Sequence, residues 1–177
     1  MRRAAHLVRR FFGALWPGAP RAVDTAWVAT VLTPSELTLW SHMPNHDRRH
    51  SINVARRVQT QLAGTHYADD PRWVAAALLH DVGKLDARLG PVRRACATLA
   101  GAVGGRGMAE LWSTKRGITR RVGLYLRHPE LGSDRIRVVG GRAEAAQWAR
   151  VHHTPDDWPS TGLPSAVVEA LAAADND

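Results

Sequence analysis

The sequence contains little lysine, one cysteine and no long hydrophobic run. All but two of its 24 basic residues are arginine, the exceptions being Lys84 and Lys115. The lone Cys96 excludes an internal disulfide, and a reducing cytoplasm is the expected compartment. The apolar neighbours of Cys96 predict a small buried side chain. No apolar stretch approaches the roughly 20 residues that a membrane-spanning helix needs, so no such helix is expected.

The composition favours one folded domain. The chain has 177 residues, of which 45% are hydrophobic, and this length suits one core better than two. Its formal net charge of +8 attracts anions such as small phosphorylated substrates. The arginines are scattered in pairs rather than gathered in a block. We therefore expect most of them on solvated helix faces, and nucleic acid is not an expected partner.

Residues 1–32 are predicted to form a basic helical extension ahead of a domain that covers residues 33–177. The arginine pair at positions 9–10 cuts the apolar stretch around Phe11 too short for a signal peptide. A packed or frayed N-terminal helix is the favoured interpretation. The alternative is an amphipathic helix that rests on a membrane or an acidic partner.

Helix start and stop signals predict an all-α fold, a helical bundle without strands. Thr33-Pro34-Ser35-Glu36 reads as a helix start, with an N-cap, a proline at the first helical position and an acid at the third. The following helices are expected over residues 45–62, 71–83, 91–103, 118–128, 133–139, 142–153 and 164–175.

The remaining segments are predicted to be irregular. Glycine pairs at 104–105 and 140–141 are expected breaks, and the proline-rich stretch 155–164 is expected to be a loop. Residues 85–119 show the weakest pattern and are predicted to be a partly ordered insertion.

Seven histidine and aspartate residues lie on apolar helix faces or at helix ends. They are His50, His80, Asp81, His128, His152, His153 and Asp175. A buried carboxylate without a partner is costly, and a divalent cation would satisfy it. Neutral imidazole and carboxylate oxygen both bind zinc, iron and manganese. The other histidines, His6, His42, His46 and His66, are expected to be hydrogen-bonded core residues or exposed.

The order of these residues resembles that of a known family. The run AALLHDVGK, from Ala76 to Lys84, resembles the signature of the HD superfamily of metal-dependent phosphohydrolases. The segment around His50 resembles the first-histidine helix of that superfamily. HPELG at 128–132 and the pair His152-His153 resemble the later histidine sites of its dinuclear members, including the HD-GYP branch. Ala173-Ala174-Asp175 resembles the closing aspartate.

The resemblance implies an HD-domain bundle that holds one or two divalent ions, Mn, Fe, Co, Zn or Mg. His50, His80, Asp81 and Asp175 would hold the first ion. Asp81 would bridge to a second ion held by His128, His152 and His153. The two consecutive histidines can share one ion only if their helix ends there, since neighbouring helical residues point about 100° apart.

Residues around these ligands carry weaker signals. Lys84 would face a substrate phosphate, and its alternative is an ordinary exposed lysine after a turn. Asn53 and Arg57 would support the site or lie on a helix surface. Asp177 is a second candidate for the closing aspartate.

The sequence departs from the HD-GYP branch after the paired histidines. Residues 154–159 stand where that branch has a glutamate and a Gly-Tyr-Pro turn, so hydrolysis of cyclic-di-GMP is not expected. A compact bacterial HD subfamily is the closer resemblance. The expected function is cytoplasmic hydrolysis of a phosphate ester such as a nucleotide or cyclic nucleotide, with Asp81 and Lys84 as catalytic residues. The alternatives are an HD-type di-iron oxygenase and a non-catalytic metal-binding signalling module.

Overall fold

The computed structural model describes residues 18–176, with the backbone alone at 91, 95, 100 and 102–106. It is 75% helical and has no strands in that range, which confirms the predicted all-α class. The elements are α2 (Ala22–Val31), α3 (Pro34–Ser41), α4 (Asn45–Leu62), α5 (Pro71–Leu79), η1 (Val82–Leu85), α6 (Pro91–Ser113), α7 (Gly117–Leu126), α8 (His128–Val138), α9 (Ala143–Val151), η2 (Pro155–Thr161) and α10 (Ser165–Asn176). His6, the residues around Phe11 and Asp177 lie outside the described residues.

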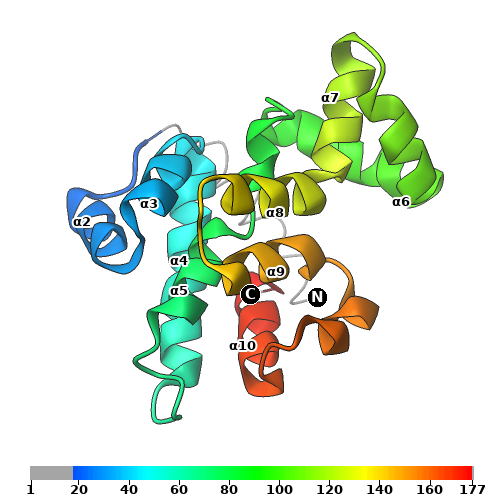
Figure 1. The fold of residues 1–177 in the computed structure, drawn as a ribbon. Helices are drawn as coiled ribbons and strands as arrows, with labels where there is room; N and C mark the ends of the chain where they lie inside the picture. Colours follow the sequence, from blue (N-terminus) through cyan, green and yellow to red (C-terminus); the bar gives the residue numbers. More distant parts are fainter. Residues whose placement is uncertain (1–17, 177) are drawn as a thin grey trace, which may run out of the picture.

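Helix α5 forms the centre of the core. Every residue from Trp73 to Leu79 is buried, and the small side chains of Ala75–Ala77 let neighbouring helices approach closely. Helices α4 and α9 pack on α5, and α10 packs on α4 (Figure 1). We call the part of the molecule formed by α2–α5 and α8–α10 the body. Val28 of α2 is fully buried in the core of the body. The domain boundary expected between residues 32 and 33 stays a prediction.

Helices α6 and α7 pack against each other as a hairpin that projects from the body (Figure 1). A buried ion pair fastens the hairpin, since the guanidinium of Arg94 donates to both carboxylate oxygens of Asp47 on α4, at 2.6 and 2.8 Å. The predicted break at 104–105 is wrong, because α6 runs through it to Ser113. The predicted burial of Cys96 is also wrong: it is exposed, because α7 covers a different face of α6.

The helix starts that carry capping signals lie where the sequence places them. Thr33 and Glu36 form the predicted capping box, and α4 spans the predicted residues. His128 was expected to end a helix but begins α8, because Pro129 suits the first turn of a helix, where its missing N–H costs nothing. Residues 155–161, expected to be a loop, form a 3₁₀ helix. No helix among the described residues is both long and apolar enough to cross a membrane.

Candidate metal centre

The fold brings together side chains from five helix segments that are far apart in the sequence. His50 lies on α4, His80 and Asp81 directly follow α5, and His128 is the first residue of α8. His152 follows the last residue of α9, and Asp175 lies near the end of α10. All seven ligands proposed from the sequence therefore lie in one cluster.

Asp81 is at the centre of this cluster, and its two oxygens face different histidines. Its Oδ2 lies 3.4 Å from Nε2 of His80 and 3.9 Å from Nε2 of His50. Its Oδ1 lies 3.4 Å from Nε2 of His128 and 3.6 Å from Nε2 of His152. The carboxylate thus stands between two pairs of imidazoles, which is the arrangement required of a ligand that bridges two cations.

The backbone fixes the orientation of three of these imidazoles. Nδ1 of His80 lies 2.8 Å from the carbonyl oxygen of Ala77, and His128 and His152 make the same contact with the residue three positions earlier, at 2.7 and 2.8 Å. A carbonyl oxygen only accepts, so each Nδ1 carries a proton, and Nε2 is the atom that presents a lone pair when the ring is neutral. A histidine that binds metal through Nε2 needs this tautomer.

The atoms that face one another are buried and unsatisfied. Nε2 of His80, His128 and His152, together with Oδ1 of Asp81, have no hydrogen-bond partner among the described residues. Buried polar atoms almost always have a hydrogen-bond partner, so four atoms without one around a single carboxylate need an explanation. A divalent cation accepts electron pairs from both atom types and fits this donor set.

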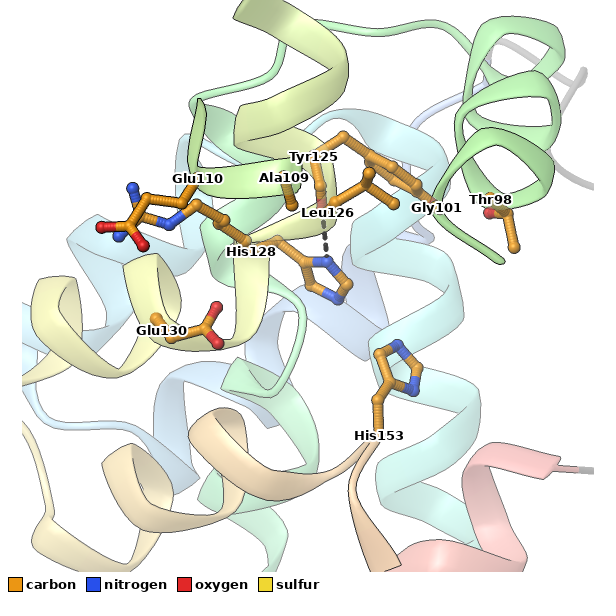
Figure 2. A pocket seen from close by; sticks show the side chains of 10 residues that line it. Thr98, Gly101, Ala109, Glu110, Tyr125, Leu126, His128, Glu130 and His153 are labelled. Carbon is orange, nitrogen blue, oxygen red and sulfur yellow. Dashed lines mark hydrogen bonds between the residues drawn. The ribbon is translucent and has the colours of Figure 1, made fainter. Parts of the chain in front are cut away.

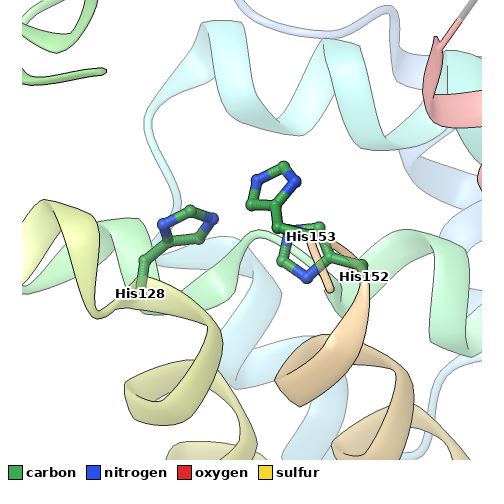
Figure 3. Close-up of side chains that lie close together, drawn as sticks. All are labelled: His128, His152 and His153. Atoms are coloured by element: carbon green, nitrogen blue, oxygen red, sulfur yellow. The ribbon is translucent and has the colours of Figure 1, made fainter. Parts of the chain in front are cut away.

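Two groups of ligand atoms are close enough to hold an ion each. One consists of His50, His80 and Asp81, and the other of His128, His152 and His153, with the atoms of each group within 4.8 Å of one another. Figure 3 shows the second group, with His128 reaching from α8 toward the pair at the end of α9. Helix α9 ends at Val151, so the condition for both consecutive histidines to face one ion is met.

Asp175 completes the first group. Its Oδ1 lies 3.1 Å from Nε2 of His50 and 3.6 Å from Nε2 of His80. Arg57 donates to the carbonyl oxygen of Ala174 at 3.2 Å, which holds the end of α10 against α4. Arg57 therefore supports the site through the backbone next to Asp175, whereas Asn53 is exposed.

The charges of the cluster differ on the two sides of Asp81. Burial opposes the charged form of His80, but the carboxylates of Asp81 and Asp175 outweigh it and raise the pKa of His80 to about 10. Burial lowers the pKa of His128 to about 4. For Asp81, burial opposes ionisation, yet Lys84 and His80 hold its pKa well below the usual range.

Lys84 is buried, so the interpretation of an ordinary exposed lysine is wrong. Its ammonium group is hydrogen-bonded to Oδ2 of Asp81, because the 3₁₀ turn of η1 brings residue 84 back over residue 81. The positive charge lies where it stabilises the central carboxylate in its ionised form.

Gly83 and Gly132 allow helix α8 to lie close to the 3₁₀ turn of η1. A Cβ atom on Gly83 would lie 2.0 Å from the carbonyl oxygen of His128 and 2.6 Å from the backbone nitrogen of Gly132. Only glycine allows this approach, and the approach places the His128 ring beside Asp81.

A pocket of about 580 Å³ opens beside His128 and His153 (Figure 2). Its walls come from the hairpin, from the start of α8 and from the residues that follow α9. They are formed by Thr98, Gly101, Ala109, Glu110, Tyr125, Leu126, Arg127, His128, Glu130 and His153. Glu110 and Glu130 were not predicted from the sequence to lie at the site. Glu130 could have been found, because it stands two residues after His128 within the run HPELG.

The histidines that were not proposed as ligands lie elsewhere. His42 and His66 are exposed. His46 is half-buried, and its Nε2 lies 3.4 Å from Oδ1 of Asp47. No family model, no curated protein and no solved structure matches the chain.

Proposed function

We propose that this protein is a metal-dependent hydrolase of phosphate esters, with one or two divalent ions held by the cluster around Asp81. The observation that carries the proposal is the position of the Asp81 carboxylate, whose two oxygens each face a pair of histidine Nε2 atoms. The ligand order that resembles the HD superfamily supports the same interpretation.

A divalent ion in such a site polarises a phosphoryl oxygen and allows water to ionise near neutral pH. The residues of the chain supply the rest. The three backbone-fixed imidazoles keep their Nε2 atoms directed inward, so little reorganisation is needed during the reaction. Lys84 keeps Asp81 ionised and offsets negative charge that develops at phosphorus.

The reaction forms a bond from a water oxygen to phosphorus and breaks the bond to the ester oxygen. The leaving alcohol takes up a proton. The pocket beside His128 and His153 offers a space where that alcohol can lie next to the cluster.

The test uses full-length protein loaded with Mn, Fe, Co or Zn and assayed with p-nitrophenyl phosphate and with nucleotides. We expect Asp81→Ala to lose bound metal and to lower kcat/KM by at least about 10³-fold, because it removes the carboxylate of the first group, which also faces His128 and His152 of the second. Asp134→Ala, at an α8 carboxylate that is 66% exposed, is the matched control and should change neither. Wild-type turnover no faster than that of Asp81→Ala with every metal would reject the proposal.

A further inference from the structure

The pocket beside the metal centre has two unlike sides. In Figure 2, Glu130 and His153 lie below His128, whereas Ala109, Leu126 and Tyr125 lie above it. Ala109, Leu126 and Tyr125 give the upper side an apolar and aromatic surface, with Glu110 at its edge, and Glu130 and His153 make the lower side polar. A volume of about 580 Å³ falls within the roughly 300–1,000 Å³ typical of small-molecule sites.

Glu130 is the unusual residue of the lower side. It lies in the first turn of α8, where the helix dipole favours a negative charge. Its Oε2 is buried and finds no hydrogen-bond donor among the described residues. A buried acceptor of this kind is costly unless a ligand supplies the missing donor.

We propose that this pocket binds the leaving alcohol of a phosphomonoester, and that Glu130 accepts a hydrogen bond from a hydroxyl or ammonium group on it. The inference rests on the proposed function, because the phosphate is taken to lie at the His128 side. The alcohol then extends between the apolar wall and Glu130. Phosphorylated polyols and phosphorylated amino alcohols share this chemistry.

The first experiment compares three monoesters on the metal-loaded protein. The leaving group of p-nitrophenyl phosphate has no donor, whereas ribose 5-phosphate offers hydroxyls and phosphoethanolamine offers an ammonium group. Glu130→Met should lower kcat/KM about 10- to 100-fold for at least one donor-bearing ester, and less than about twofold for p-nitrophenyl phosphate. Glu169→Met, at an exposed glutamate of α10, is the control.

A second variant separates the two sources of the donor. Glu130→Gln keeps an acceptor but removes the charge. It should therefore preserve turnover of ribose 5-phosphate if the ligand is a polyol, and lower turnover of phosphoethanolamine if the ligand is an ammonium compound. Equal losses with all three esters for Glu130→Met would overturn the proposal.

A binding measurement makes the test independent of turnover. Calorimetric titration with 2-aminoethylphosphonate and 2-hydroxyethylphosphonate, which have no ester to hydrolyse, should show at least one of them binding wild type about 10-fold or more tighter than Glu130→Met. Phenylphosphonate should bind both proteins equally. If wild type fails to hydrolyse p-nitrophenyl phosphate while this difference is found, the proposed hydrolysis fails and the pocket assignment stands. Equal binding of all three phosphonates to both proteins overturns the pocket assignment.

Discussion

The body and the α6–α7 hairpin bury apolar surface to different extents. In α5 every residue from Trp73 to Leu79 is buried. On the hairpin, by contrast, five large hydrophobic side chains are exposed in the described part of the chain: Val92, Leu99, Met108, Leu111 and Ile118. The small core beneath it consists of Ala87, Leu89 and Ala97. The residues proposed to hold metal belong to the densely packed part, and the apolar wall of the pocket belongs to the sparsely packed one.

This difference in packing suits the two roles that we propose, which are holding metal in the body and contacting substrate at the hairpin. Metal ligands must be held within a few tenths of an ångström, which dense packing provides. A wall that contacts substrate tolerates adjustment, and regions with few buried apolar contacts open at low free-energy cost. Substitutions in the body and in the hairpin should therefore differ in their effects on stability and on activity.

The largest effect is expected where the two regions are joined. Arg94→Met leaves Asp47 buried without its partner and should lower the free energy of unfolding by about 3–5 kcal/mol in a urea titration. Arg72→Met removes ion pairs with Asp70 and Glu144 from an arginine side chain that is 49% exposed, and should lower the free energy of unfolding far less, because water screens exposed ion pairs. Equal losses would show that the hairpin is not fastened at Asp47.

The two lysines give a matched comparison of function. Lys84→Met should lower kcat/KM about 10- to 100-fold, equivalent to about 1.4–2.7 kcal/mol, because Asp81 loses its ammonium partner. Lys115→Met, at an exposed position between α6 and α7, should leave the rate unchanged. Metal content measured on each variant separates a rate effect from loss of the ion. An unchanged rate for Lys84→Met would remove this residue from the proposed catalytic set.

Two glycines should change stability in opposite directions. Gly83→Ala places a methyl group 2.0 Å from a backbone oxygen of α8 and should destabilise the protein by about 3 kcal/mol or more. Gly107→Ala lies inside α6 with nothing within 4 Å of the added atom, and should stabilise by about 0.5–1 kcal/mol. Thermal unfolding of both variants checks the pair, and the same sign for both would contradict the packing described for η1 and α8.

Helix starts were predictable where local chemistry decides them. The capping box at Thr33 and the proline at 71 act through their immediate neighbours, so the sequence contains the whole signal. The cluster was predictable because charged residues on apolar faces need partners, and His80-Asp81 stands in a recognisable motif. The exposure of Cys96 was not predictable, because an alanine-rich helix looks apolar on every side until its neighbour is known.

The pocket could not be predicted for a related reason. Glu110 and Glu130 are far apart in the chain and face one space only because the hairpin packs above the start of α8. The hydrogen bond from Lys84 to Asp81 likewise depends on a 3₁₀ turn that the helix pattern did not indicate. Long-range packing, which no local pattern records, decides both features.

Three imidazoles of the centre owe their orientation to backbone carbonyls three residues earlier, at Ala77, Tyr125 and Ala149. Every amino acid supplies that carbonyl, so the hydrogen bond that orients each imidazole does not depend on which side chain stands at the carbonyl's position. A lineage that keeps the seven residues proposed to hold metal, the glycine contact and the helix ends can change many of its other residues. Overall sequence similarity then fades long before the chemistry does, and related sites are best sought by geometry.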